Sequence, residues 1–214
     1  MIKHVVFDFD GTLVDSKGIF LNIYNGMAQQ KGYVQMTPDN IEHLRTLSIT
    51  KRCSYLNIPL YQIPFVAVRF IRKYREAIPL LEFNSGVEGM LKELDKAKVP
   101  YSILSSNSHE NIAVFFEKKR LRAPDIFCSS NIFGKDRVLA KFLKIKKLDK
   151  SDILYVGDEL RDVVACRKIG VKIAWVSWGY DSIEALQDHQ PDYVIDDPNA
   201  LCDLVLNFRR LSHK

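Results

Sequence analysis

Two carboxylates lie close together where the first apolar run of the chain stops. Residues 5–7 lead to Asp8 and Asp10, and Gly11 follows at once. Alternation along a strand sends the side chains of Asp8 and Asp10 to one side, and glycine lets the backbone turn sharply after them. Two like charges at this spacing repel each other unless a cation lies between them. The pattern therefore predicts a site for a hard divalent cation with oxygen ligands, most simply Mg²⁺.

The elements around these acids predict an α/β protein. Short β-branched runs alternate with helix-length amphipathic segments, which is the pattern of a doubly wound, Rossmann-like parallel sheet covered by helices on both faces. In such open sheets the ligand crevice lies beyond the carboxyl ends of the strands, where Asp8 and Asp10 are delivered. The predicted strands are Lys3–Phe9, Tyr101–Ser105, Ile126–Ser129, Ile153–Val156, Lys172–Val176 and Tyr193–Ile195.

Several helix starts can be read from local signals. Ser85–Glu88 and Asp181–Glu184 have the spacing of a capping box, an N-cap oxygen followed three residues later by a carboxylate. Thr37-Pro38 has the form of an N-cap followed by proline at the first helical position. Each of these segments predicts that a helix begins there.

One interval between the predicted strands is too long for a simple crossover. Roughly ninety residues separate the first strand from the second, more than one crossover helix requires. Residues 15–83 show helical stretches only, among them Tyr61–Ala77 with apolar residues at helical spacing. We therefore predict an all-helical cap domain over residues 15–83, inserted into an α/β core domain of residues 1–14 and 84–214.

Composition limits the class of protein. The 214 residues are 47% hydrophobic and 27% charged, with a formal net charge of +5 at pH 7. No apolar run could cross a bilayer and no signal peptide precedes the first strand, so we expect a cytoplasmic protein without a membrane partner. The basic clusters Lys118–Arg122 and Lys144–Lys147 resemble helix C-termini more than a nucleic-acid surface. A zinc site is not expected, because no Cys-x-x-Cys pair occurs among Cys53, Cys128, Cys166 and Cys202, and a disulfide framework is not expected at this chain length.

The complete first motif, Asp8-Phe9-Asp10-Gly11-Thr12-Leu13-Val14-Asp15, resembles that of the haloacid dehalogenase-like hydrolases, in particular their phosphoglycolate phosphatase-like group. The resemblance implies that Asp8 is a nucleophile forming an aspartyl-phosphate and that Asp10 is the general acid and base. Dehalogenases of the family lack an acid at the second position, so Asp10 favours phosphate esters as substrates. The loop at Gly11 and Thr12 is expected to bind the phosphate.

Two further segments match the family's motifs in chain order. After the second predicted strand, the resemblance assigns the phosphate-binding hydroxyl to Ser106, with Asn107 beside it as a phosphate or substrate contact. Farther along, it assigns the lysine that neutralises phosphate charge to Lys135. Family members commonly have Lys-Pro there and this chain has Lys135-Asp136, so Lys141 stays open as the alternative.

The last motif is the run from Gly157 to Asp162, which resembles the family's Gly-Asp-x-x-x-Asp. It implies that Asp158 is the third protein ligand of Mg²⁺, beside the Asp8 side chain and the Asp10 carbonyl. Asp162, one helical turn later, is expected to hold these ligands in place. Glu159 is explained as an acid in the first turn of a helix.

The motifs together predict a Mg²⁺-dependent phosphatase that hydrolyses a small phosphorylated metabolite and acts as a monomer or homodimer. A phosphotransferase such as a sugar phosphomutase would use the same aspartyl-phosphate and remains an alternative. A non-catalytic binding protein on the same fold is the third. Residues 176–180 and 191–197 resemble the same group more weakly, which leaves either a substrate-side loop or plain core positions open.

Overall fold

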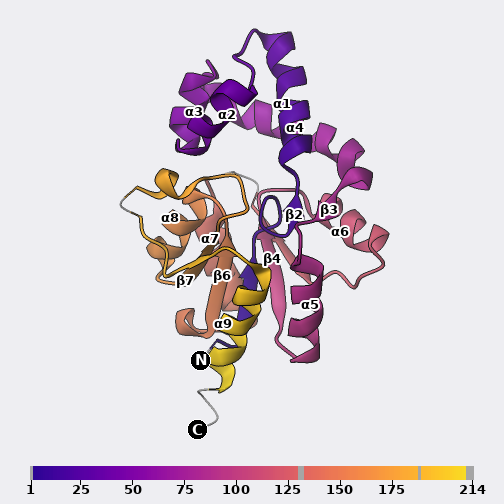
Figure 1. Cartoon of the computed structure of the whole chain (residues 1–214), viewed down its shortest axis with the longest axis vertical. Coiled ribbons are helices and arrows are strands. Elements are labelled where there is room, and N and C mark those ends of the chain that lie inside the picture. Colours follow the sequence, from indigo (N-terminus) through magenta and orange to yellow (C-terminus); the bar gives the residue numbers. More distant parts are fainter. Residues whose placement is uncertain (1, 130–132, 188, 211–214) are drawn as a thin grey trace.

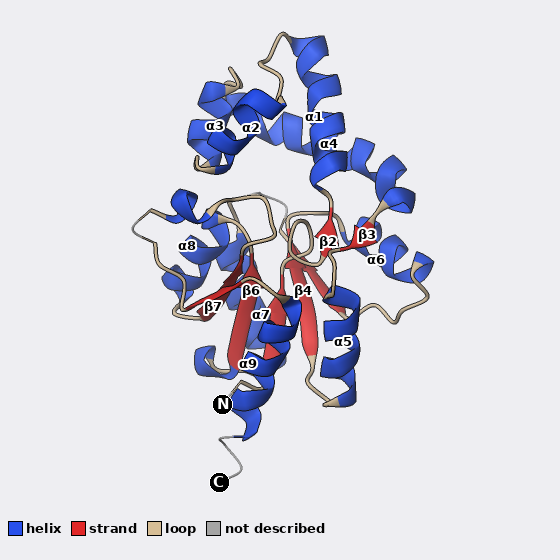
Figure 2. Cartoon of the chain, in the orientation of Figure 1, coloured by secondary structure: helices blue, strands red, loops and turns tan. Residues whose placement is uncertain are grey.

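A computed structural model describes residues 2–129, 133–187 and 189–210 (Figure 1). Its central element is a six-stranded parallel sheet in the order β5-β4-β1-β6-β7-β8 (Figure 2). From β1 the chain builds outward to β4 and β5 on one side and then to β6, β7 and β8 on the other. The switch in direction therefore lies beside β1. The strands are β1 (His4–Phe7), β4 (Tyr101–Ser105), β5 (Asp125–Cys128), β6 (Ile153–Gly157), β7 (Lys172–Val176) and β8 (Tyr193–Ile195).

The predicted fold class and all six predicted strands are confirmed, but the first strand ends earlier than expected. β1 stops at Phe7, two residues before the predicted end at Phe9. The Phe9 amide donates to the side chain of Asp8, and the Phe9 carbonyl accepts from the amides of Leu13 and Val14. These bonds turn the backbone into a tight loop, so the two acids lie beyond the strand end.

Helices cover both faces of the sheet because strand side chains alternate between them. Val5 and Phe7 pack into one buried cluster and Val6 into another on the opposite face. The first cluster holds α5 (Val87–Lys96), α6 (His109–Lys118) and α9 (Pro198–Arg210), and the second α7 (Lys135–Lys146) and α8 (Leu160–Ile169).

Of the three helix starts predicted from the sequence, one is confirmed and two have the wrong N-cap. At Thr37-Pro38 the prediction is confirmed, since α2 begins at Pro38 and the Thr37 amide donates to Asn40 Oδ1 at 2.9 Å. The N-cap predicted at Ser85 is wrong by one residue. Gly86 is the N-cap of α5, and its φ of 80° is a left-handed conformation that suits glycine.

The second predicted capping box is also wrong, because the Asp181 carboxylate is engaged elsewhere. It accepts the Leu160 amide at 2.8 Å, at the start of α8, and pairs with Arg52 at 2.6 Å. Only a short 3₁₀ turn, Ile183–Leu186, follows it, with Ser182 as the N-cap.

Residues between β1 and α5 form a group of helices that lies beyond the carboxyl edge of the sheet in Figure 1. They pack on one another around a third buried cluster that includes Tyr24, Leu44 and Leu56. No helix in the described part of the chain is long and apolar enough to span a bilayer. The helices are α1 (Lys17–Lys31), α2 (Pro38–Arg45), α3 (Ile49–Tyr55) and α4 (Ile63–Ala77), with short 3₁₀ turns at Leu60–Gln62 and Ile78–Leu80.

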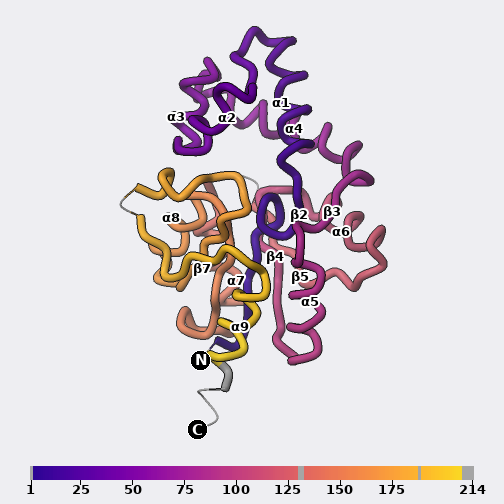
Figure 3. Tube along the Cα trace, in the orientation of Figure 1, coloured from indigo at the N-terminus to yellow at the C-terminus, as the bar shows by residue number. Residues whose placement is uncertain are grey.

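The expectation of helices only over residues 15–83 needs one correction. Asp15 belongs to a two-residue strand, β2 (Val14–Asp15), which pairs antiparallel with β3 (Glu82–Phe83). The tube in Figure 3 shows the indigo chain leaving for α1 and the magenta chain returning side by side at this point. β2 and β3 thus pair the two segments of the chain that connect the helices with the sheet.

Candidate active site

Asp8, which follows β1, is buried and bonded to a lysine. Only 1% of Asp8 is exposed, and its Oδ2 accepts from Lys135 Nζ at 2.6 Å. Lys135 opens α7, is 2% exposed, and also donates to Asp162 Oδ1 at 2.5 Å. Burial raises the pKa of Asp8 to about 7, against the opposing effect of the Lys135 ammonium. One lysine thus bridges two buried carboxylates.

The structure distinguishes between the two lysines that the sequence left open. Lys141, farther along α7, is exposed, whereas Lys135 is buried against Asp8. Burial alone would lower the pKa of Lys135, but Asp162 and Asp8 outweigh it and the net shift is upward. Lys135 therefore stays charged in contact with Asp8.

Asp10 has different partners and faces the helices. Its Oδ2 accepts from Asn107 Nδ2 at 2.9 Å, and its Oδ1 accepts from the hydroxyl of Tyr74 in α4. Asn111 Nδ2 donates to Asn107 Oδ1 at 2.9 Å and fixes the orientation of that amide. Burial raises the pKa of Asp10, and the hydrogen bonds from Tyr74 and Asn107 oppose the shift. The result is a carboxyl group suited to hold and release a proton.

The loop after the two acids holds Asp158 in place. Thr12 Oγ1 donates to Asp158 Oδ1 at 2.6 Å, and the Tyr180 amide donates to Asp158 Oδ2 at 2.7 Å. Gly11 has φ 78°, and a Cβ there would lie 2.4 Å from Asp158 Oδ2. Glycine is therefore required at this position both by conformation and by space. Burial and the charge of Glu159 raise the pKa of Asp158 well above its usual range.

Three buried carboxylates lie close enough to share a metal ion. Asp8, Glu159 and Asp162 each place one oxygen within 4.8 Å of the others. Of the predicted side-chain ligands this set contains Asp8, whereas the Asp158 carboxylate accepts from Thr12 and from the Tyr180 amide in the loop after β7. Sequence reasoning treated Glu159 as a first-turn acid and so missed its place in this group.

The charges around this group suit a divalent cation. Asp8, Asp158, Glu159 and Asp162 are all buried. Lys135 pairs with Asp8 and Asp162, and Arg161 pairs with Glu159. With all four acids ionised, two negative charges remain in excess, and buried charge of one sign is costly unless it is paired. The donors are oxygens, the ligands that Mg²⁺ prefers, so the residues present fit such an ion.

Ser106 is connected to this acidic group through Arg161. Arg161 Nη1 donates to Ser106 Oγ at 3.0 Å, and the same guanidinium pairs with Glu159. Sequence reasoning did not single out Arg161. A readable signal existed, because a cation in the first turn of a helix opposes the helix dipole and needs another explanation.

The segment after β7, left open by the sequence, is part of the site. Besides its amide bond to Asp158, Tyr180 shares a hydrogen bond of 2.7 Å between its hydroxyl and Ser16 Oγ. Arg45 Nε donates to the Tyr180 carbonyl at 3.1 Å, which links this segment to α2. Residues 176–180 thus join the acidic group to the helices, and residues 193–195 form the edge strand β8.

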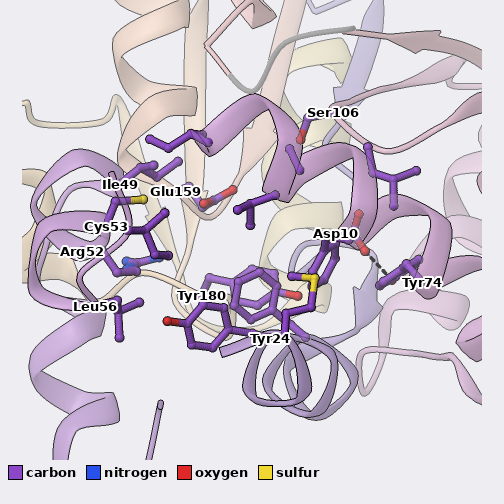
Figure 4. A pocket seen from close by; sticks show the side chains of 18 of the residues that line it. Asp10, Tyr24, Ile49, Arg52, Cys53, Leu56, Tyr74, Ser106, Glu159 and Tyr180 are labelled. Atoms are coloured by element: carbon purple, nitrogen blue, oxygen red, sulfur yellow. Dashed lines mark hydrogen bonds between the residues drawn. The ribbon is translucent and has the colours of Figure 1, made fainter. Parts of the chain in front are cut away.

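A cavity of about 210 Å³ lies between the sheet edge and the helices. Asp10, Ser106 and Arg161 line its sheet side, and residues of α1, α3 and α4 line the other. Figure 4 shows Asp10 joined to Tyr74 at one end of it and Ile49 and Leu56 at the other. The cavity connects the polar groups at the strand ends with the helical part of the chain.

The chain matches the model of the haloacid dehalogenase-like hydrolases over residues 5–176. It belongs to this family. A phosphoglycolate phosphatase of Synechococcus elongatus is 30% identical over 211 residues, covering 98% of this chain and 100% of that protein. An N-acetylmuramic acid 6-phosphate phosphatase of Pseudomonas aeruginosa is 24% identical, with 95% of each chain covered. The crystal structure of a predicted phosphatase from Clostridium acetobutylicum has the same fold, with TM-score 0.81, 18% identity and coverage of 97% of this chain and 99% of that one.

The resemblance to the phosphoglycolate phosphatase-like group of haloacid dehalogenase-like hydrolases is thereby confirmed, and so is the prediction of a phosphatase. The candidate residues lie in three bonded groups, of which the group of Asp10, Asn107 and Tyr74 lines the cavity, as do Ser106 and Arg161. One joins Asp8, Lys135 and Asp162; a second joins Asp10 to Asn107 and Tyr74; the third joins Thr12 to Asp158, with Ser106 held by Arg161 nearby.

Proposed function

We propose that this hydrolase is a Mg²⁺-dependent phosphatase that hydrolyses a small phosphorylated metabolite through an aspartyl-phosphate on Asp8. The observation that supports it most directly is a buried carboxylate, Asp8, bonded to the buried ammonium of Lys135 beside a cavity whose wall carries Asp10. A nucleophile, a phosphate-neutralising cation and an acid/base group are thus within one site. The cytoplasmic location and the monomeric or homodimeric state stay predictions.

In the first chemical step, an oxygen of Asp8 attacks phosphorus and the bond between phosphorus and the ester oxygen breaks. The proton of Asp10 passes to the departing alkoxide, so that a neutral alcohol leaves. Lys135 offsets the charge of the phosphoryl oxygens, and Ser106 and Asn107 offer hydrogen bonds to them. The bond of Arg161 to Ser106 keeps that hydroxyl at the cavity wall.

In the second step, water attacks the phosphorus of the aspartyl-phosphate. Asp10, now ionised, takes the proton of the water, and the bond between phosphorus and Asp8 breaks to release phosphate and restore the carboxylate. The raised pKa of Asp10 suits both directions of proton transfer. Its bond to Asn107 holds the carboxyl group on the side where ester and water must lie.

We propose that Asp8 and the Asp10 carbonyl hold Mg²⁺ together with an acid that follows β6. Asp158 is the ligand that the family resemblance implies, and Glu159 is the one that lies with Asp8 and Asp162 in the structure. When bound, Mg²⁺ would supply positive charge against the acidic group and the transferring phosphoryl group.

We propose further that residues 15–83 act as a cap domain over a core of residues 1–14 and 84–214. The β2–β3 pair joins the two parts, and Tyr74 carries a direct bond from α4 to Asp10. Closure of these helices would shield the aspartyl-phosphate from stray water and select the alcohol part of the substrate. The final residues of the proposed core, 211–214, lie outside the described residues.

The test is release of inorganic phosphate from a panel of phosphate esters, including phosphoglycolate and N-acetylmuramic acid 6-phosphate, the substrates named for its relatives. Asp8→Asn should lose at least about 10⁴-fold in kcat/KM. Asp39→Asn, on the exposed first turn of α2, is the control and should keep full activity. An isomerised sugar phosphate without free phosphate would show a mutase instead, and full activity of Asp8→Asn would remove the nucleophile.

A further inference from the structure

The cavity beside Asp10 is apolar along most of its wall. Its polar end, at the sheet, carries Asp10, Ser106, Asn107, Glu159 and Arg161, and Arg52 lies beside Leu56 on the helix side (Figure 4). Figure 4 shows Leu56 on the helix side, on the far side of the view from Asp10. Apolar side chains of the helices make up the rest of that wall, among them Met27, Leu56, Ile63, Val66, Phe70 and Ile71.

The cations that line the cavity are already engaged by protein groups. Among the described lining residues these are Arg52 and Arg161. Arg52 pairs with Asp181 at 2.6 Å and donates to two backbone carbonyls of the α2–α3 region. Arg161 pairs with Glu159 and donates to Ser106. A carboxylate placed among the apolar side chains would therefore have to share a guanidinium that already has a protein partner, and its burial would cost more than that of an apolar group.

The volume sets an upper limit on the apolar group. The cavity measures about 210 Å³. In another protein, an apolar cavity of about 150 Å³ holds one benzene molecule. There is therefore room for a phosphate at the polar end together with one ring or a short alkyl chain.

We infer that the substrate is a phosphate monoester of a small apolar alcohol or phenol, an inference that rests on the phosphatase activity proposed above. The phosphate lies at the Asp8–Asp10 end, and the apolar group lies between α1, α3 and α4. Glycolate does not belong to this class, because its carboxylate would lie in the apolar part of the cavity.

A homologous series of n-alkyl phosphates, from methyl to hexyl, tests the inference with the intact chain and Mg²⁺. Each added methylene should raise kcat/KM about fourfold until the cavity is full. Butyl phosphate should then be hydrolysed more efficiently than phosphoglycolate. No rise with chain length, or a preference for phosphoglycolate over butyl phosphate, would overturn the inference.

A matched pair of variants on α4 locates the effect in the cavity. Val66 lines the cavity, whereas Val68 is 70% exposed on the same helix. Val66→Arg should lower kcat/KM for butyl phosphate at least about tenfold, because a charge replaces part of the apolar wall. Val68→Arg should leave the whole series unchanged. Circular dichroism should show that both variants are folded. If kcat/KM then depends on chain length equally in the two variants, the inference is overturned.

Non-hydrolysable n-alkylphosphonates separate the inference from the proposed function. If no ester releases phosphate, the proposed function fails, and calorimetric binding of these phosphonates with Mg²⁺ decides the inference by itself. A Kd that falls about fourfold per methylene supports the apolar site. A Kd independent of chain length, or absence of binding, overturns it.

Discussion

The carboxyl edge of the sheet and the helices that face it differ in the kinds of side chain that they present. At the sheet edge, buried acids are matched to Lys135 and Arg161 through short, specific bonds. Across the cavity, the helices α1, α3 and α4 present mainly apolar side chains. In the function proposed above, the sheet edge carries the chemistry and the helices choose the alcohol. The two regions should therefore respond to mutation in different ways.

After Asp8→Asn, the largest effect is expected at the lysine of the sheet edge. Lys135→Ala should lower kcat/KM about 10²–10³-fold, because the transferring phosphoryl group loses a preorganised positive charge. It should also cost about 3–5 kcal/mol of stability, since Asp8 and Asp162 lose their buried partner. Steady-state kinetics and urea unfolding measure both. Lys141→Ala, on the exposed side of α7, should change neither, and equal effects would break the assignment.

The next effect separates the two candidate metal ligands after β6. Asp158→Asn and Glu159→Gln should differ in the Mg²⁺ concentration that gives half-maximal activity. Substitution of the true ligand should raise this Mg²⁺ concentration about 10–100-fold, and substitution of the other acid should change it much less. The same comparison by calorimetry with Mg²⁺ alone needs no turnover. An equal, small effect of both substitutions would contradict a Mg²⁺ site at this end of the sheet.

A smaller effect is expected where the two regions meet. Tyr74→Phe removes the hydroxyl that α4 donates to Asp10 and should lower kcat about tenfold. Because that bond lowers the pKa of Asp10, its loss should move the Asp10 limb of the pH–rate profile to higher pH. Tyr33→Phe, which removes a hydroxyl that donates to Gln62 within the helical group, is the control. An unchanged pH–rate profile in Tyr74→Phe would show that α4 does not influence proton transfer at Asp10.

The smallest effect concerns stability far from the cavity. Burial lowers the pKa of His4 to about 4 from its usual 6.5, and Ser102 Oγ lies 2.9 Å from its ring. Between pH 6.5 and 4 the unfolded chain binds more protons at His4, so its contribution to stability is lost as pH falls through this window. Over this window the free energy of unfolding of the wild type should fall about 1–2 kcal/mol more than that of His4→Gln, a difference reduced because the imidazole is partly accessible to solvent.

Urea unfolding of both chains at pH 7 and at pH 4.5 measures this difference. Activity at pH 7 should be equal in the two chains, because His4 lies at the start of β1, away from the acids. A difference in stability that stays constant with pH would show that His4 titrates normally in the folded protein.

The sheet edge could be predicted because its signals are local. Apolar runs of strand length end in Asp8, Ser105 and Gly157, and parallel strands bring such ends together. The contacts that complete the site are not local. The bond between Tyr74 and Asp10 joins residues 64 positions apart, and no pattern along the chain records which hydroxyl reaches which carboxylate.

The errors in the sequence predictions have the same origin. Asp181 has the spacing of a capping residue, but tertiary contacts with Leu160 and Arg52 take its carboxylate. Glu159 fits a first-turn acid equally well, until packing places it beside Asp8. The apolar wall formed by α1, α3 and α4 was visible only as helical periodicity, which fixes a buried face but not what that face surrounds.

The most direct test of the account is the identity of the group that binds phosphorus. Enzyme mixed with a hydrolysed ester and Mg²⁺, quenched in acid within the first turnover and digested, should yield one phosphorylated peptide, the one that contains Asp8 and Asp10, with the phosphoryl group on Asp8. The account is contradicted if phosphate is released in that turnover while every peptide carrying Asp8 remains unmodified.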